Sequence, residues 1–497
     1  MKILLISLNQ QDVEEYKKAP TDISALGVRY LSSYLKSQSQ EVKILFLAKP
    51  YGVAESQEEL EQINNLINEQ KPDLIGLSLM SNHFFRAKQI TKNIKEKFSA
   101  LPVIWGGIHP TIDPAGCLAY ADLVCVGEGE LPLSQLAQGD NLKQYQNLNL
   151  AGIWYKKNGQ IVNGEKADLV KEIDRLPNPD YDLENHYIIH QDKLVPLSIE
   201  IFRQYYPASR GDHRLISTRG CPHACAYCCN SVFRDMYGGG YLRKRFVEQV
   251  IAEMKVTREK FPFLKSFKIM DDSFTVNDLD WIRKFSRRYQ TEINLPFYCL
   301  ISPLTITQEK LDLLVAAGLS TAQMGLQSGS DRINQEIYLR QVKTDQFLAA
   351  AKLLEKYQNR VSVSIDVIVD NPYETESDLL LTAEILNQIK RPFHLSLFSL
   401  AFYPGTELYR RASQDKILAN NEEYLDKQFH LFKKNYLNKI IYLVPHLPPE
   451  KVKVLLAKRN KLFYKFQVEL LYLFLTKKNK MPSMLIKAAK ILKHLLK

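Results

Sequence analysis

The chain has 497 residues and a formal charge of +11, with 45% hydrophobic and 24% charged residues. This length exceeds one ordinary core, and the composition excludes general disorder, a fibrous repeat and a small disulfide-stapled scaffold. No apolar run reaches the roughly 18 residues that would cross a bilayer, and the first residues become polar too soon for a secretory signal. We therefore expect a cytoplasmic protein of two or three domains.

Residues 1–140 alternate apolar strands with helices. The expected strands cover residues 2–8, 42–47, 74–79, 103–105 and 123–126, and the expected helices cover residues 23–36, 57–68 and 84–97. Strands that are apolar on both faces belong in a parallel sheet covered by helices. The pattern therefore predicts an α/β, doubly wound domain of the Rossmann-like or flavodoxin-like kind.

Ligands of such sheets lie beyond the carboxyl ends of the strands. The loops that follow the third, fourth and fifth expected strands are rich in glycine and polar residues. These loops place the following residues at the ligand-binding edge: Ser78, Ser81, Gly106, Gly107, His109, Gly127, Glu128 and Gly129.

Regular patterning fades between residues 141 and 205. A hairpin is expected about Asn158 and Gly159, a pair that favours a tight turn between two strands. Pro177 and Pro179 cannot continue a helix or a central strand, because proline lacks an amide donor. We therefore expect this segment to be a connector between two domains.

The alternation of strands and helices resumes between residues 206 and 410. The expected strands cover residues 214–218, 266–270, 297–301, 321–326, 361–369 and 395–401. Six such units predict a partial (β/α)6 barrel, whose chemistry lies at the carboxyl ends of its strands. Residues 411–497 are expected to be mainly helical, with breaks at their prolines, and they carry much of the surplus of lysine.

The strongest motif follows the first barrel strand. Cys221, Cys225 and Cys228 have the spacing C-x3-C-x2-C on one loop, which favours a metal site over disulfide bonds. Three such thiolates can each bind one iron of a 4Fe-4S cluster and leave the fourth iron open to substrate. The alternative is a structural zinc ion, which needs a fourth ligand. His223 is available for that role, whereas Cys229 adjoins Cys228 and is poorly placed.

With Tyr227 before the last cysteine, this motif resembles the radical S-adenosylmethionine superfamily. The resemblance implies that Cys221, Cys225 and Cys228 bind the cluster and that the open iron chelates S-adenosylmethionine, whose reductive cleavage yields a 5′-deoxyadenosyl radical. It also implies contacts to S-adenosylmethionine after the second and fourth barrel strands. The candidates for these contacts are Asp271, Asp272, Gln327 and Ser328. The alternative for the two aspartates is an ordinary acidic surface turn.

The first domain together with the barrel resembles the cobalamin-binding subgroup of this superfamily. The resemblance rests on residues 23–31, 106–111 and 126–130, and it extends over most of the chain up to the end of the barrel. It implies cobalamin at the sheet edge, where glycines let the backbone approach a planar corrin. The D-x-H-x-x-G sequence that places histidine on cobalt is absent, so His109 is expected to cap its loop or meet a cobalamin side chain. The alternative is a flavodoxin-like domain with another ligand or a docking role.

The resemblance implies methylation of an unactivated carbon, with one S-adenosylmethionine methylating cobalamin and another generating the radical. A radical cyclisation or ring rearrangement without methyl transfer is the second enzyme hypothesis. The third hypothesis is a cobalamin- or metal-sensing protein without turnover. A small-molecule or lipid-like substrate is expected between the barrel and the corrin, and a flavodoxin or ferredoxin is expected as the electron donor.

The basic segment 449–497 has two interpretations. Its lysines and apolar residues, including residues 470–475, could lie in a membrane interface with the basic side toward anionic lipid. The same pattern could pack its apolar side on the barrel, and this interpretation is slightly preferred. Nucleic acid is not expected as a partner, because no binding motif accompanies the charge. The location expected is the cytoplasm, with peripheral contact to the inner face of the membrane as a further option.

Overall fold

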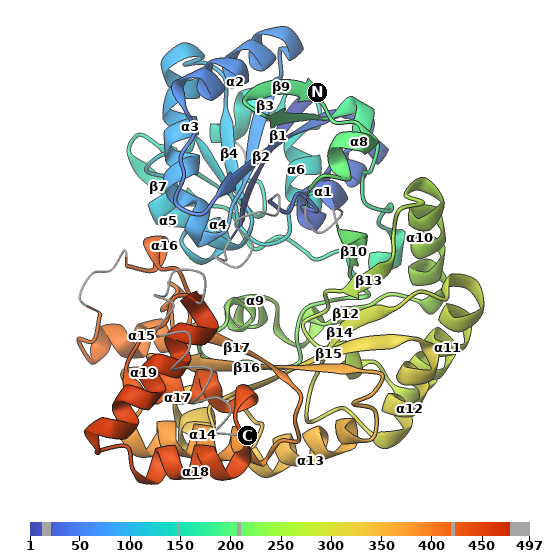
Figure 1. Cartoon of the computed structure of the whole chain (residues 1–497). Helices are drawn as coiled ribbons and strands as arrows, with labels where there is room; N and C mark the ends of the chain where they lie inside the picture. The colour runs from blue at the N-terminus through green and yellow to red at the C-terminus, as the bar shows by residue number, and fades with distance from the viewer. Residues whose placement is uncertain (12–20, 148, 206–209, 419–422, 478–497) are drawn as a thin grey trace.

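The computed structural model describes residues 1–11, 21–147, 149–205, 210–418 and 423–477. It contains two α/β parts and a helical carboxy-terminal part (Figure 1). The first part has a nine-stranded sheet and the second has a six-stranded parallel sheet. This confirms the predicted fold class, a doubly wound domain followed by a partial barrel. No helix among the described residues is long and apolar enough to cross a membrane.

The first sheet has a parallel centre. Its strands, in the spatial order β5-β4-β3-β1-β2, are β1 (Lys2–Gln11), β2 (Glu41–Pro50), β3 (Leu74–Ser78), β4 (Val103–Gly106) and β5 (Leu123–Cys125). One face packs on α1 (Leu26–Ser37) and α6 (Glu130–Leu136), and the other packs on α2 (Gln57–Gln70) and α3 (Phe84–Lys97). Helices on both faces explain why these strands are apolar along their whole length.

The segment predicted as a connector also extends this sheet at both edges. It forms two hairpins: β6 (Ile153–Lys157) with β7 (Gln160–Asn163), and β8 (Tyr187–His190) with β9 (Lys193–Pro196). The first hairpin is the one predicted about Asn158 and Gly159. The sequence does not predict the second hairpin, because short edge strands are half exposed and lack a long apolar run.

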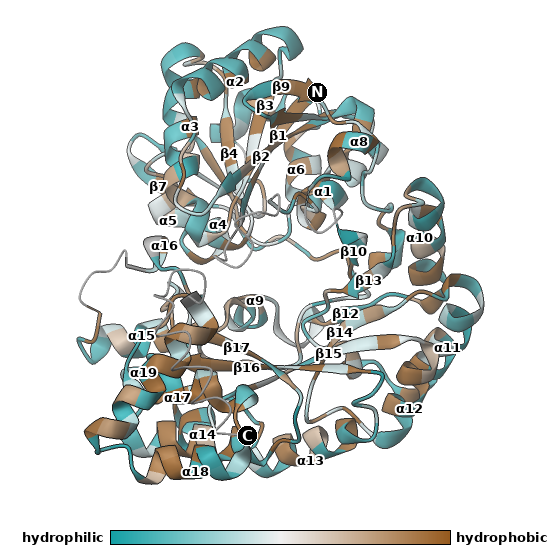
Figure 2. Cartoon of the chain, viewed as in Figure 1, coloured by the Kyte–Doolittle hydropathy of each residue, from teal (hydrophilic) through white to brown (hydrophobic). Residues whose placement is uncertain are grey.

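The barrel strands lie side by side in the order of the chain. They are β10 (Asp212–Leu215), β13 (Ser266–Ile269), β14 (Phe297–Ile301), β15 (Leu319–Gln327), β16 (Ser362–Val369) and β17 (His394–Ser399). The helices that cover them are α10 (Val247–Lys260), α11 (Leu279–Arg288), α12 (Gln308–Ala317), α13 (Thr344–Glu355) and α14 (Glu376–Gln388). Apolar residues gather in the strands and on the sides of the helices that face them (Figure 2). Within the described residues β10 and β17 do not pair, so the barrel is open.

One helix in each of the two α/β parts begins with the same arrangement of hydrogen bonds. The Ser56 hydroxyl at the start of α2 accepts from the Glu59 amide, and the Glu59 carboxylate accepts from the Ser56 amide. Thr375 and Asp378 form the same reciprocal pair at the start of α14. Such a capping box satisfies amides that would otherwise lack partners, and it fixes the residue at which each helix begins.

The carboxy-terminal part packs on the barrel. Its helices are α15 (Glu407–Gln414), α16 (Glu423–Asp426), α17 (Tyr436–Leu443), α18 (Pro449–Ala457) and α19 (Leu462–Lys477). Helices α17 and α18 contact α14, and α19 contacts α17. Leu470 and Leu471 are buried, so packing on the barrel is the interpretation that holds for this part of the basic segment. Pro482 and the lysines beyond residue 477 lie outside the described residues.

Candidate active site

Two adjoining cavities lie where the strand ends of the first sheet face the barrel. Their volumes are about 600 and about 440 Å³. Both are lined by Gly27, Val28, Ser78, Gly107, Ile108 and Met270. The first five of these residues belong to the first domain and Met270 follows barrel strand β13, so the cavities lie between the two parts.

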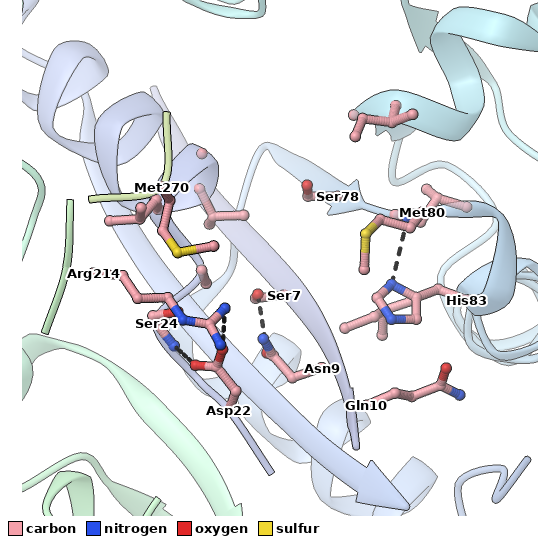
Figure 3. Close-up of a pocket in the computed structure, with 18 of the residues that line it drawn as sticks. Ser7, Asn9, Gln10, Asp22, Ser24, Ser78, Met80, His83, Arg214 and Met270 are labelled. Carbon is pink, nitrogen blue, oxygen red and sulfur yellow. Dashed lines mark hydrogen bonds and ion pairs between the residues drawn. The ribbon is translucent and has the colours of Figure 1, made fainter. Parts of the chain in front are cut away.

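The first cavity is lined on its barrel side by Arg214 and Met270 (Figure 3). Arg214 of β10 reaches across to Asp22 of the first domain, with 2.5 Å between nitrogen and oxygen. Ser7 and Asn9, at the end of β1, hydrogen-bond to each other at 3.1 Å. His430 also lines this cavity, so the carboxy-terminal part contributes a residue to the site.

The second cavity reaches from the sheet edge to the loop that carries the cysteine motif. Glycines line its sheet side: Gly76, Gly106, Gly107, Gly127 and Gly129. At Gly107 φ is +102°, and a Cβ atom there would lie 2.9 Å from the Leu79 carbonyl oxygen. A Cβ atom at Gly76 would lie 2.8 Å from the Leu5 side chain. Glycine is therefore required at Gly107, where backbone approaches closely and φ is positive, whereas a Cβ atom at Gly76 would displace the end of the Leu5 side chain.

Six of the sequence-predicted residues of the first domain line these cavities. They are Ser78, Gly106, Gly107, Gly127, Glu128 and Gly129. Ser81 and His109 do not line either cavity: both are buried, and the Ser81 hydroxyl lies 3.2 Å from His109 Nδ1. The His109 ring packs on Phe84, and burial lowers its pKa to about 4, so the ring is neutral. The buried ring lines neither cavity, and the capping role stays a prediction for His109.

Glu128 joins the sheet edge to the cysteine loop. Its carboxylate pairs with Arg219 at 3.1 Å and with Arg243, while Glu130 pairs with Arg219 at 2.8 Å. Arg219 ends strand β11 (Thr218–Arg219), two residues before Cys221. Burial opposes ionisation of Glu128, but the hydrogen bonds and charges of both arginines outweigh it and lower its pKa. The sequence does not predict these two arginines, because the pairs join residues about 100 positions apart.

The three motif cysteines follow β11 on one loop that leads into α9 (Cys229–Tyr237). The loop is held by backbone: the Ala226 amide donates to the Tyr338 carbonyl at 2.8 Å, and the Ala226 carbonyl accepts from the Leu408 amide at 3.0 Å. The Tyr227 ring meets the Tyr338 ring edge-on, with centroids 4.9 Å apart. Cys221, Cys225 and Cys228 are all partly exposed.

These residues do not make a closed zinc site. In the part of the chain that the structure describes, no three His, Cys, Asp or Glu side chains are arranged to hold one metal ion. One ring nitrogen of His223, Nε2, lies 3.3 Å from the Ser302 hydroxyl. Three separated thiolates on an open loop suit a larger cluster with one iron for each thiolate.

The two aspartates after β13 have different roles. Asp271 is buried, and its carboxylate accepts from the Ser217 amide at 2.6 Å, from the Thr218 amide at 3.0 Å and from the Ser217 hydroxyl. Burial raises the pKa of Asp271 to about 6, although these bonds oppose the shift. Asp271 therefore braces the chain before the cysteine loop and offers no free group. Asp272 lines the second cavity and is open to it, so it remains available to a ligand.

The two candidate residues at the end of β15 also differ in burial. Ser328 is fully buried and donates to Glu374 Oε1 at 3.0 Å, so it shapes the turn. Gln327 is half-buried and has a φ of +66° at an irregularity in the pairing of β15 with β16. Arg340 holds this irregularity, because its guanidinium donates to the Gly325 carbonyl at 2.6 Å and to the Leu326 carbonyl at 3.0 Å. The sequence carries no local signal for Arg340.

Two family models match the chain, the B12 binding domain over residues 17–137 and the radical SAM superfamily over residues 215–386. The chain belongs to the cobalamin-binding radical S-adenosylmethionine enzymes. The family's cofactors are cobalamin, a 4Fe-4S cluster and S-adenosylmethionine.

Relatives of this enzyme cover most of the chain. An uncharacterized methyltransferase of Pyrococcus horikoshii is 26% identical over 427 residues, which are 84% of each chain. An anaerobic magnesium-protoporphyrin IX monomethyl ester cyclase of Rubrivivax gelatinosus is 22% identical over 80% of this chain and 68% of its own.

Solved structures have the same fold. The cobalamin-dependent enzyme OxsB with aqua-cobalamin bound has a TM-score of 0.66 at 16% identity and covers 99% of this chain and 75% of its own. The methyltransferase TsrM from Kitasatospora setae, with tryptophan substrate and a SAM analogue bound, has a TM-score of 0.64 at 15% identity and covers 87% of this chain and 84% of its own.

The residues of this radical SAM enzyme fit the family's cofactors. A corrin is broad and planar and carries polar amide arms, and the two cavities offer glycine backbone beside short polar side chains such as Ser7, Asn9 and Ser78. The S-adenosylmethionine ammonium group is a cation, which suits the open carboxylate of Asp272. Ser7 and Asn9 line the first cavity, Asp272 lines the second, and Ser78 lines both.

Proposed function

We propose that this enzyme methylates an unactivated carbon atom of its substrate. The observation that carries the proposal is the second cavity. It is lined on one side by Gly106, Gly107 and Gly127 of the sheet edge, and on the other by Gly220 and Asp272 beside the cysteine loop. A methyl source at the sheet edge and a radical source at the barrel would thus act on one shared space. The methyltransferases among its relatives support this choice.

We assign the cluster to Cys221, Cys225 and Cys228, and the S-adenosylmethionine ammonium group to Asp272. When bound, the cluster with S-adenosylmethionine supplies a hydrogen-abstracting radical, and cobalamin supplies the methyl group. Gln327, beside Gly325 at the end of β15, is assigned a polar contact to S-adenosylmethionine. The sheet-edge glycines and Ser78 are assigned to cobalamin.

The protein's own residues fix how the two halves of the site face each other. Glu128 and Glu130 hold Arg219, and Glu128 also holds Arg243, so the sheet edge is tied to the chain that enters the cysteine loop. Asp271 and Arg340 brace the ends of β10 and β15. A rigid mutual position excludes water and keeps the reacting groups near one another, which is the main work of the protein in such chemistry.

Methyl-labelled S-adenosylmethionine tests the proposal. The full chain, anaerobically reconstituted with iron, sulfide and cobalamin, is incubated with reductant and with small-molecule extract of its source cells. Label in a carbon-bound methyl group of a product supports methylation. Deoxyadenosine without transferred label would favour the cyclisation or rearrangement alternative, which the R. gelatinosus cyclase among the relatives makes the second candidate. If neither product forms, the sensing alternative remains.

For the electron donor we propose a flavodoxin or ferredoxin. These proteins are acidic, and the chain carries a net charge of +11. The expected result is that reduced flavodoxin supports deoxyadenosine formation and that its rate falls as salt rises, because screening weakens a charge-guided encounter. A rate that salt does not change would contradict this proposal.

A peripheral membrane contact is a further proposal for the start of α19. Leu462, Phe463 and Phe466 are exposed there, beside Lys461 and Lys465. Apolar side chains flanked by lysines favour an anionic lipid surface. Flotation with phosphatidylglycerol vesicles tests this contact. We expect the wild-type protein to float with the vesicles and the triple variant L462S/F463S/F466S to stay unbound. A wild-type protein that does not bind the vesicles would contradict the proposal.

A further inference from the structure

One segment of the carboxy-terminal part reaches across to the first domain. It covers residues 424–433, which we call the strap, and it begins in α16, which lies between the two α/β parts (Figure 1). Tyr424 and Leu425 are buried in a hydrophobic cluster whose other buried members, among the described residues, come from residues 4–189. The strap thus takes part in the core of the first domain, although helices α17 and α18 pack on the barrel.

The contacts at the first-domain end of the strap are limited. Helix α16 has four residues, too few for a helix to be stable without its surroundings. The Tyr424 hydroxyl donates to Asp113 at 3.2 Å, and the Tyr424 ring centroid lies 6.0 Å from that of His109. Docking at this end therefore depends mainly on the burial of Tyr424 and Leu425.

The barrel end of the strap is held by several hydrogen bonds. The Phe429 carbonyl accepts from the Ser399 amide of β17 at 2.6 Å. The Lys433 amide donates to Asp370 Oδ2 at 2.8 Å, and the Ser399 hydroxyl donates to the same oxygen at 2.7 Å. Asn438 Nδ2 donates to the other carboxylate oxygen of Asp370 at 2.8 Å. We therefore expect the strap to open at its first-domain end while its barrel end stays in place.

Between its two ends the strap forms part of the wall of the first cavity. His430 lines this cavity, and its ring centroid lies 4.0 Å from that of Phe429 and 5.5 Å from that of Phe398. Helix α16 contacts the turn Ser81–His83, and Met80 before this turn lines the same cavity. A ligand that fills the first cavity would therefore touch the first domain and the strap together.

We propose that strap docking and ligand binding in the first cavity are coupled through His430. A ligand that bridges His430 and the first-domain wall holds the strap in place, and the docked strap in turn strengthens binding of the ligand. Such coupling is reciprocal, so the two effects have the same factor. The inference rests on the assignment of cobalamin to the sheet edge in the proposed function, but not on methyl transfer, and its test needs no turnover.

Hydrogen exchange measures the effect of the ligand on the strap. The full-length protein, reconstituted with iron and sulfide, is compared with and without saturating hydroxocobalamin. We expect cobalamin to slow the exchange of residues 424–433 by about tenfold, within the usual range of such couplings. Residues 436–457 of the same part, which pack on the barrel, should exchange at an unchanged rate. Strap exchange that cobalamin does not slow, or equal slowing in both segments, would overturn the proposal.

The double variant Y424S/L425S measures the effect of the strap on the ligand. It places two polar side chains in an apolar cluster, so the first-domain end should undock and exchange rapidly. Equilibrium dialysis should show that cobalamin affinity falls by the factor by which cobalamin slows strap exchange in the wild type. Leu425→Ala loosens the same end with a smaller disturbance of the first domain. It should raise strap exchange at least about tenfold and lower cobalamin affinity in the same direction.

Two control variants separate the strap from general stability. Leu425→Met keeps the buried volume and should keep wild-type exchange and affinity. Arg459→Ala removes an ion pair of 2.6 Å with Glu376, which joins the carboxy-terminal part to the barrel helix α14, and should also change neither quantity. Wild-type cobalamin affinity in Leu425→Ala despite faster strap exchange, or an equal loss of affinity in Arg459→Ala, would overturn the proposal.

The variant His430→Ala tests the contact itself. Tyr424 and Leu425 stay in place, so the strap should still dock, but cobalamin should slow its exchange by a much smaller factor than in the wild type. Full slowing in His430→Ala would overturn the assigned role of His430. A failure of methyl transfer would contradict the proposed function alone, because exchange and dialysis are measured without turnover.

Discussion

Strand β3 of the first sheet and strand β16 of the barrel are both parallel strands rich in Ile, Leu and Val, but their two faces meet different surroundings. In β3 residues 74–77 are all buried, because α1 and α6 cover one face of the sheet and α2 and α3 cover the other. In β16 only alternate residues are buried through its first half, and Ser364 and Asp366 face the partly open interior.

The difference shows two ways of making room for a ligand. The first domain leaves space at its strand ends, where glycines such as Gly76 and Gly107 line the cavity. The barrel leaves space along its inner wall and fills that wall with hydrogen-bonding groups. Shape is therefore the main property of the first wall, and polar chemistry is the main property of the second. The changes below test each wall and then the contacts that join them.

The largest effect is expected at the barrel side, from Cys225→Ala. We propose that this thiolate binds iron, so its loss should lower the iron content and reduce deoxyadenosine formation by more than about 100-fold. Iron and sulfide analysis and a deoxyadenosine assay measure this. Cys299→Ala is the control, because Cys299 is fully buried in the barrel core and its loss should leave iron content unchanged. Wild-type iron content in Cys225→Ala would remove this residue from the ligand set.

The next effect tests whether shape governs the sheet-edge wall. Gly27 lines both cavities, and a Cβ atom there would meet nothing within 4 Å. Gly27→Leu should therefore fold normally, with helix α1 slightly favoured, but its side chain would fill space needed by the corrin. We expect cobalamin affinity to fall by about 30-fold or more, measured by equilibrium dialysis.

Gly239→Leu is the matched control for this change. Gly239 also has open space at its Cβ position, and it lines neither cavity. Cobalamin affinity should stay at the wild-type value there. Equal losses in the two variants would mean that the effect at Gly27 is not a matter of cavity shape.

Some features of the site can be predicted from the sequence and others cannot. The cysteine loop and the glycines at strand ends are local patterns, and the structure places them where the sequence predicts strand ends. The burial of His109 and Asp271 could not be predicted in this way, because it depends on neighbours such as Ser81 and Ser217 that approach through folding. The polar inner wall did leave a signal, since Gln323 and Asp366 interrupt apolar strands at alternate positions.

A third change tests the contacts that join the two walls. Glu128→Gln removes one partly buried charge, and Arg219 keeps its pair with Glu130. We expect the free energy of unfolding to fall by about 2 kcal/mol at pH 7. The folded-state pKa of Glu128 is lowered, so the stabilisation is present above its unfolded pKa near 4.5 and is lost as pH falls below that value.

Denaturant titrations at pH 7 and pH 4 measure the difference between wild type and Glu128→Gln. The difference should shrink toward the lower pH, because Glu128 of the unfolded wild-type chain then takes up a proton before the folded carboxylate does. A difference of the same size at both values would show that the loss comes from packing and not from the ion pairs with Arg219 and Arg243.

The smallest effect is expected where the carboxy-terminal part meets the first domain. The Tyr424 hydroxyl of α16 donates to Asp113 at 3.2 Å, and its segment leads to His430 at the first cavity. Tyr424→Phe removes this one bond and should cost about 1 kcal/mol. Hydrogen exchange should rise in residues 423–435, while the exchange of β3 stays unchanged. Tyr409→Phe, whose ring centroid lies 6.4 Å from that of Tyr424, is the control and should leave exchange unaltered. An equal rise in both variants would show that the bond to Asp113 is not what holds this segment over the cavity.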